Sequence, residues 1–130
     1  MAKSFHDYLK PEDLLHGSIL NFIRYQFPGW VITHPMNEGK RSRFEQFLAQ
    51  YLGMRAGIPD LMIFEPRQGP DRFYTGLALE VKVKGNKPTP KQVEFMDDLR
   101  RKGWMVHVVY SLEEAVKVTR EYAQLAEIRF

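Results

Sequence analysis

Asp60, Glu80 and Lys82 are residues whose types and spacing could carry out hydrolysis. Side chains alternate along a strand, so Glu80 and Lys82 would share one face of the apolar stretch 76–83, about 7 Å apart. If the strand that begins after Asp60 pairs antiparallel with this stretch, the two carboxylates come close together. Neighbouring carboxylates repel each other unless a cation lies between them. The spacing therefore predicts a cation site with a lysine beside it.

The available ligand types favour a hard cation. The chain has no cysteine, and oxygen ligands are those that Mg²⁺ and Mn²⁺ prefer. Such a cation stabilises negative charge on a phosphodiester and lowers the pKa of a bound water. Lys82 can orient that water or stabilise the transition state by its charge. These residues therefore favour phosphodiester hydrolysis with Mg²⁺ or Mn²⁺ as cofactor.

Basic residues lie on both sides of the two carboxylates along the chain. Nineteen Lys and Arg outnumber sixteen Asp and Glu, which gives a net charge of +3. This surplus is modest, and the clustering of the basic residues is the stronger indication of a polyanionic partner. The residues that we expect to contact the phosphates of such a partner are Lys40, Arg41, Arg43, Lys84, Lys87 and Lys91. A solvated surface is the alternative interpretation of each.

Helix and strand signals indicate how these residues are positioned. Helices are expected from Pro11 to the Pro28-Gly29 turn, over 42–52, from Thr89 to about Lys102, and from Ser111 toward Leu125. Strands are expected at 30–34, 61–64, 76–83 and 104–110, with a long hairpin-like loop over 65–75.

The connections between these elements predict a mixed sheet. A helix links the strands 76–83 and 104–110, which indicates a crossover and parallel pairing. The shorter link between 61–64 and 76–83 favours antiparallel pairing. The chain length of 130 residues suits one domain, residues 1–130. We therefore expect an α/β fold with a mixed β-sheet core flanked by helices on both faces.

Composition excludes several other classes of protein. Hydrophobic residues make up 44% of the chain, which is typical of a globular protein and not of a disordered one. The absence of cysteine excludes disulfides, thiolate zinc sites and cysteine nucleophiles. No apolar run approaches the ~20 residues that span a bilayer, and the N-terminus lacks the apolar core of a signal peptide. We expect an intracellular, cytoplasmic protein with no membrane partner.

The motifs around the candidate residues resemble those of VRR-NUC (virus-type replication-repair nuclease) domains. The residues that carry this resemblance are Gly57-Ile58-Pro59-Asp60-Leu61, Leu79-Glu80-Val81-Lys82, Gly85, Thr89-Pro90-Lys91-Gln92 and Gly103. The similarity runs from about Glu12 to Ala115 and includes the stretch 37–41, where the family usually has an Asn-Gly-Gly-like turn before basic residues. Glu38 departs from that pattern. The family belongs to the PD-(D/E)xK nucleases, so the resemblance implies a restriction-endonuclease-like fold.

The resemblance also implies roles for individual residues. Asp60 and Glu80 would be metal ligands together with the backbone carbonyl of Val81. Lys82 would be the catalytic lysine. Gln92 would point back toward the site from the helix that follows, although the N3 position of a capping box also explains a glutamine there.

Two further assignments come from the resemblance. Glu12 would be an additional acidic metal ligand on the first helix, with Asp13 as its rival. Asn37 would belong to the turn that contacts DNA. His34 and His107 each lie in an apolar strand and are interpreted as hydrogen-bonded structural residues, so no zinc site is expected from them.

The function that the resemblance implies is that of a metal-dependent DNA endonuclease in DNA repair. Stand-alone members of the family act as homodimers on branched DNA, including four-way (Holliday) junctions, so a homodimer and a branched DNA substrate are expected. The alternative is a catalytically silent DNA-binding or assembly module with the same fold. The presence of Asp60, Glu80 and Lys82 argues against that alternative.

Overall fold

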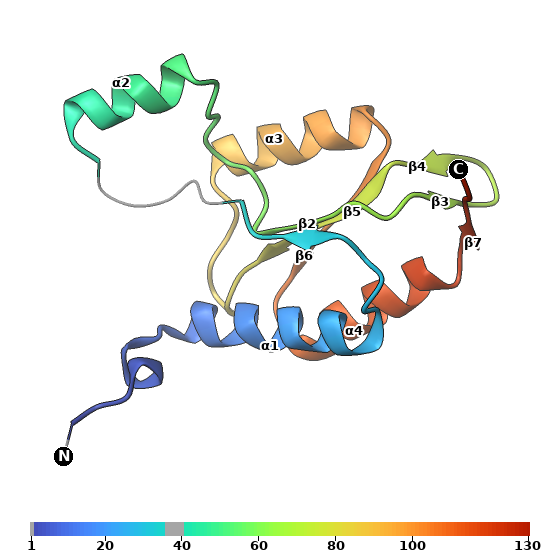
Figure 1. Ribbon diagram of the computed structural model, residues 1–130, viewed down its shortest axis with the longest axis horizontal. Coiled ribbons are helices and arrows are strands. Elements are labelled where there is room, and N and C mark those ends of the chain that lie inside the picture. Colours follow the sequence, from blue (N-terminus) through green and yellow to red (C-terminus); the bar gives the residue numbers. More distant parts are fainter. Residues whose placement is uncertain (1, 36–40) are drawn as a thin grey trace.

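A mixed four-stranded sheet lies at the centre of the fold in the computed structural model, which describes residues 2–35 and 41–130 (Figure 1). The strands, in sheet order, are β1 (Ile32–Thr33), β2 (Leu61–Ile63), β5 (Gly76–Val81) and β6 (Trp104–Val109). β2 pairs antiparallel with both β1 and β5, whereas β5 and β6 are parallel. The pairing predicted from the connection lengths is confirmed.

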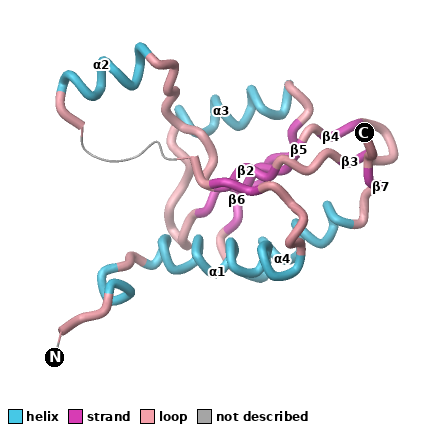
Figure 2. The backbone as a smooth tube through the Cα atoms, viewed as in Figure 1, coloured by secondary structure: helices cyan, strands magenta, loops and turns pink. Residues whose placement is uncertain are grey.

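Helices cover both faces of this sheet, as Figure 2 shows. The helices of the described residues are α1 (Pro11–Gln26), α2 (Arg43–Tyr51), α3 (Pro90–Arg101) and α4 (Leu112–Ala123), preceded by a short 3₁₀-helix, η1 (Phe5–Tyr8). α1 and α4 lie against one face and α3 against the other. The predicted mixed α/β fold is therefore confirmed. Within the described residues, no helix combines the length and the hydropathy that crossing a membrane requires.

The side chains of β5 alternate between two apolar clusters. Leu77, Leu79 and Val81 are buried in the cluster that also holds residues of α1 and α4. Ala78 belongs to a second cluster, with Met96 of α3. The expected alternation is confirmed, although β5 ends at Val81 and not at residue 83.

Residues 65–75 differ from the expected loop. They contain β3 (Arg67–Gln68) and β4 (Phe73–Tyr74), and β3 also pairs with β7 (Ala126–Glu127) near the C-terminus. Strands of two residues are too short to show alternation, so the sequence gives no signal for them. The buried Arg67 guanidinium holds this second sheet together, since it donates to the carbonyls of Ala123 and Leu125 at 3.1 and 3.0 Å.

The second helix forms where expected, but its apolar side chains do not enter the core. Ser42 caps α2 by accepting a hydrogen bond from the Glu45 backbone N–H at 3.2 Å. Phe44 and Phe47 remain 68% and 61% exposed, and Ala49 is the buried residue of this helix. In Figure 1, α2 lies apart from the sheet and the other helices. Within residues 2–35 and 41–130, an apolar face of α2 is therefore left uncovered.

Candidate functional site

β2 and β5 bring Asp60 and Glu80 together. The last residue pair between these strands is Leu61 with Leu79, so Asp60 and Glu80 face each other one step further along the ladder. The Asp60 Oδ2 atom accepts a hydrogen bond from the Val81 backbone N–H at 2.8 Å. This bond fixes the aspartate beside the end of β5.

Glu80 is a buried acid, 1% exposed. Burial raises the pKa of its carboxyl to about 10, helped by a hydrogen bond with Asp60 and by the negative charges of Asp60 and Glu12. Its Oε2 atom has no hydrogen-bond partner among the described residues. A buried carboxyl beside a second acid, with an oxygen unsatisfied, fits a site for a hard cation.

Lys82 completes this group from the residue after β5. Its backbone N–H donates to the Val109 carbonyl at 3.0 Å, which extends the pairing of β5 with β6. Its positive charge lowers the pKa of Glu80, opposing the effect of burial. The structure thus brings Asp60, Glu80 and Lys82 into one neighbourhood.

Of the two acids near the start of α1, Glu12 is the one whose charge acts on this group. Glu12 is half-buried, and its negative charge contributes to the raised pKa of Glu80. The Asp13 carboxylate instead accepts a hydrogen bond from the Lys10 backbone N–H at 3.0 Å. Asp13 is exposed and caps the helix.

Gln92 occupies the first turn of α3, where it caps the helix. Its Oε1 atom accepts the Thr89 N–H at 2.8 Å, and the Thr89 Oγ1 accepts the Gln92 N–H at 3.2 Å. The segment leading to Asp60 passes very close to this turn, since a Cβ at Gly57 would lie 2.4 Å from the Lys91 carbonyl oxygen. Gly57 also has φ +93°, which favours glycine. The capping interpretation of Gln92 is confirmed, and a second role stays a prediction.

The basic residues expected to contact DNA lie on both sides of the site along the chain. Lys84, Lys87 and Lys91 are exposed, in the loop after β5 and the first turn of α3. Arg43 is exposed at the start of α2, and the half-buried Arg41 donates to the Met54 sulfur at 3.6 Å. Asn37 and Lys40 lie outside the described residues.

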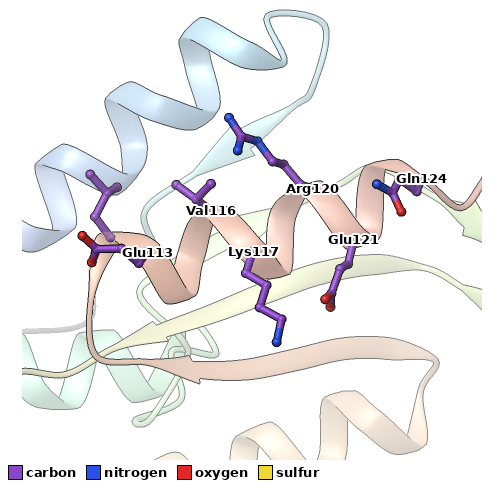
Figure 3. Close-up of a pocket in the computed structure, with 7 residues that line it drawn as sticks. Glu113, Val116, Lys117, Arg120, Glu121 and Gln124 are labelled. Carbon is purple, nitrogen blue, oxygen red and sulfur yellow. The ribbon is translucent and has the colours of Figure 1, made fainter.

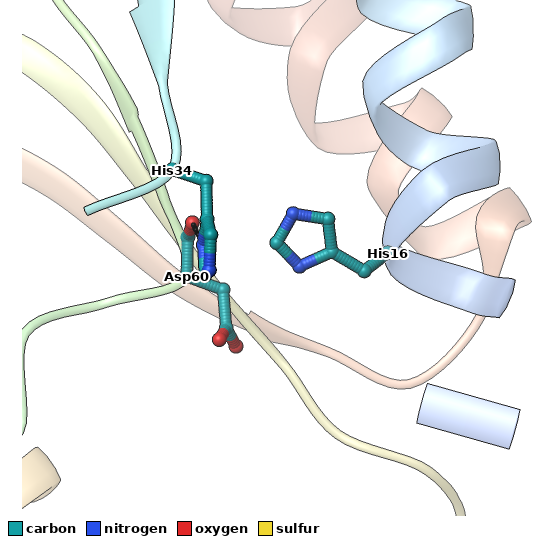
Figure 4. Close-up of side chains that lie close together, drawn as sticks. All are labelled: His16, His34 and Asp60. Carbon is teal, nitrogen blue, oxygen red and sulfur yellow. Dashed lines mark hydrogen bonds between the residues drawn. The ribbon is translucent and has the colours of Figure 1, made fainter. Parts of the chain in front are cut away.

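Two histidines adjoin Asp60, and the sequence patterns did not connect them with the carboxylates. His16 comes from α1, and His34 follows β1 (Figure 4). The rings of His16 and His34 meet edge to face with centroids 4.6 Å apart, and His34 Nδ1 lies 2.6 Å from the Asp60 carbonyl oxygen. One ligand atom from each of the three residues lies within 4.8 Å of the others, so this group could bind a metal ion.

A sequence signal for His16 exists in its spacing. His16 follows Glu12 by four positions, which places both on one face of α1. The interpretation of His34 as a hydrogen-bonded residue is confirmed. In the sequence, however, His34 stands as a lone histidine, and the proximity of His16 and Asp60 was not predicted. His107 lies on β6 opposite Leu79, and burial lowers its pKa.

A hollow along α4 offers no comparable chemistry. It has a volume of about 470 Å³ and is lined by Leu112, Glu113, Val116, Lys117, Arg120, Glu121 and Gln124 (Figure 3). Acidic and basic side chains alternate there at helical spacing, as on a solvated helix surface. The group around Asp60 and Glu80 is therefore the candidate site.

Comparisons with known proteins identify the domain family of this chain. A family model described as the VRR-NUC domain matches residues 21–113, which include Asp60, Glu80 and Lys82. The chain is similar to a solved structure described as a VRR_NUC domain protein, at 25% identity over 93% of this chain and 96% of that chain, with a TM-score of 0.71. A second, described as a VRR_NUC domain, supports the fold alone, at 24% identity over 82% and 96%, with a TM-score of 0.52. No curated protein matches the chain.

Proposed function

Because this chain belongs to the VRR-NUC nuclease-domain family, we propose that it is a metal-dependent DNA endonuclease. The observation that carries the proposal is the buried Glu80 carboxyl held against Asp60, with the charge of Lys82 acting on Glu80. Two such acids ionise together only if positive charge lies beside them. A divalent cation supplies that charge and is the partner that hydrolysis of a phosphodiester requires.

The residues present fit Mg²⁺ or Mn²⁺. Asp60, Glu80 and the Val81 carbonyl would hold the cation, and Glu12 would supply a further oxygen. The bound cation would stabilise charge on the phosphoryl oxygens and activate water for attack. Lys82 would orient that water or stabilise the transition state by its charge. Gln92 would reach the bound DNA or cation only by leaving its capping bond to Thr89.

Phosphate contacts would come from the basic residues around the site. Lys84, Lys87 and Lys91 lie in the chain just after the catalytic group and are exposed, so they can reach the DNA backbone. Arg41 and Arg43 would extend this surface toward α2. Asn37 and Lys40, outside the described residues, stay predicted DNA contacts. These contacts carry no sequence information, which suits an enzyme that selects DNA by shape.

The substrate class that we propose is branched DNA, such as a four-way junction, cut by a homodimer. The two-fold symmetry of a dimer matches a junction that presents two related strands. A second copy of this chain would cover the exposed face of α2, where the rings of Phe47 and Tyr51 stack 5.9 Å apart. Light scattering should show a dimer that Phe47→Glu dissociates, whereas Gln50→Glu, also on α2, should not.

Cleavage assays test the activity directly. The purified chain should cut four-way junction, flap, nicked or plain duplex DNA in Mg²⁺ or Mn²⁺ but not in EDTA. Asp60→Asn and Glu80→Gln remove charge with little change in volume and should each lower the cleavage rate by about 10²-fold or more. Glu113→Gln, on the outer face of α4, is the matched control and should cut normally.

Two outcomes would overturn this function. Cleavage that persists in EDTA would exclude the metal mechanism. Binding of DNA without cleavage in either cation would instead identify a catalytically silent DNA-binding module.

A further inference from the structure

The His34 ring is oriented by the backbone of Asp60. A carbonyl oxygen only accepts hydrogen bonds, so at 2.6 Å the His34 Nδ1 must carry the proton and donate it. The lone pair of the neutral ring is then on Nε2. Metal-binding histidines in proteins are oriented in the same way, by donating their other ring N–H to a carbonyl or carboxylate.

His16 approaches the same place from α1. It is half-buried, whereas His34 is exposed, so an ion could enter from the His34 side. Figure 4 shows the His16 ring pointing from its helix toward His34 and Asp60. Glu12, one helical turn earlier, acts on Glu80. α1 therefore presents a nitrogen ligand and an oxygen ligand to the same edge of the sheet.

The spacing of the three residues is close to that of a filled site. Their ligand atoms lie within 4.8 Å of one another. Two atoms bound to one dication lie at most about 4.2 Å apart, because each is about 2.1 Å from the ion. Small side-chain rotations would bring the ligand atoms from their present separation to the separation in a filled site.

We propose that His16, His34 and Asp60 form a nitrogen-containing metal site, so that this chain binds a first-row transition-metal dication through imidazole as well as carboxylate ligands, with Mn²⁺ as its spectroscopic probe. Imidazole nitrogen suits transition metals such as Fe²⁺ and Zn²⁺, whereas Mg²⁺ prefers oxygen ligands and retains its waters. Mn²⁺ shares the preference for oxygen, so nitrogen bound to it reports the histidines directly. Asp60 would serve both this site and the pair with Glu80. The inference deepens the proposed function, on which it rests for the role of the metal in catalysis.

Electron paramagnetic resonance of Mn²⁺ tests the site without DNA or activity. Mn²⁺ is titrated into the full chain, the loss of the free-ion signal gives the affinity, and electron spin echo modulation detects directly coordinated nitrogen. We expect nitrogen modulation in the wild type. His16→Leu and His34→Asn should each weaken Mn²⁺ binding at least about tenfold, given that even the residues supporting a ligand contribute 10–100-fold.

The variants are chosen to preserve the fold. The Asn amide nitrogen can replace His34 Nδ1 in the hydrogen bond to Asp60 while removing Nε2. His107→Asn on β6 is the matched control and should bind Mn²⁺ like the wild type. Should a variant fail to fold, as judged by circular dichroism, the nitrogen modulation of the wild type decides alone.

The outcomes separate this inference from the proposed function. Mn²⁺ binding without nitrogen modulation, or with unchanged affinity in both folded variants, overturns the histidine site. If DNA is nevertheless cut in Mg²⁺, the proposed nuclease function stands. Nitrogen modulation in a chain that cuts no DNA would support the histidine site and overturn only the proposed activity.

Discussion

Asp60 and Glu80 face each other at the end of the β2–β5 ladder, where Asp60 helps to raise the pKa of Glu80. Asp60 is fixed there by the Val81 N–H, and Glu80 is enclosed by the core on both sides of its strand. Without a cation, burial and the neighbouring acid keep the pKa of Glu80 near 10. This arrangement costs the metal-free protein stability, because unfolding releases the glutamate into water.

Glu80→Gln should therefore stabilise the protein in EDTA. A group whose folded-state pKa is raised contributes its full stabilisation below the unfolded value of 4.5 and loses it as pH rises toward about 10. At pH 8 we expect the variant to gain on the order of 1–3 kcal/mol in free energy of unfolding. Thermal melting from pH 5 to 9 measures this, and the gain should shrink toward pH 5.

The control for this prediction is an exposed acid. Glu113→Gln on α4 should leave the pH dependence of the melting temperature unchanged. In saturating Mn²⁺ the wild type should be more stable than Glu80→Gln, since only the wild type retains the charged ligand. If Glu80→Gln melts at a lower temperature than the wild type in EDTA at every pH, the Glu80 carboxyl does not destabilise the metal-free protein.

Metal binding should release a proton from Glu80. Because the carboxyl is protonated in the metal-free protein at neutral pH and ionised when it binds a cation, affinity should rise with pH by up to about tenfold per unit. Isothermal titration calorimetry of Mn²⁺ in buffers of different ionisation enthalpy counts the protons released. We expect a count near one for the wild type and a clear decrease for Glu80→Gln.

The sequence predicts those parts of the site that depend on neighbouring stretches of chain, and not those that depend on how distant elements pack together. Strand alternation and the length of the connection are enough to predict that Asp60 and Glu80 meet. The neighbourhood of His34 is not predictable in this way, because it depends on how α1 lies across the sheet. The turn at Gly57 and the capping of α3 by Gln92 follow from the local sequence, but their close approach to each other does not.

The second sheet, β4-β3-β7, also could not be predicted from the sequence. β7 pairs with β3 although they are far apart in the chain, and each is two residues long. Arg67, which joins them, is an ordinary basic residue in the sequence, and its burial follows only from the tertiary structure. The exposed face of α2 is the converse case, because its apolar pattern predicts a packing face that the described part of the chain does not cover.

Arg67→Ala should destabilise the fold without changing the residues of the candidate site. The guanidinium pairs with Glu65 at 2.9 Å and lies over the Trp30 ring, so its loss leaves two partly buried carbonyls and a carboxylate unpaired. We expect a loss of about 2–3 kcal/mol in free energy of unfolding, somewhat below the usual effect of breaking a buried pair because Glu65 is partly exposed. Urea denaturation measures it, with Arg72→Ala in the same hairpin as the control.

Lys82→Ala should separate catalysis from binding. Removing one of several phosphate-binding side chains costs little affinity, whereas removing the charge beside the reacting phosphate should lower the rate by about 10²-fold or more. Cleavage rates and fluorescence anisotropy with labelled DNA measure the two effects. Lys117→Ala, on α4, should change neither; a Lys82→Ala enzyme that cuts at the wild-type rate would exclude the catalytic role.

Lys87 and Lys91 should contribute to DNA binding through phosphate contacts alone. Both side chains are exposed just beyond the site, in the loop after β5 and the first turn of α3. Each phosphate contact displaces condensed counterions, so replacing both lysines by alanine should flatten the slope of log K against log salt by about two. The loss of affinity should be similar for junctions of different sequence, because such contacts do not read bases. Anisotropy titrations between about 50 and 200 mM salt give the slopes. Lys117→Ala on α4 should keep the wild-type slope, and an unchanged slope in the double variant would mean that these lysines only face solvent.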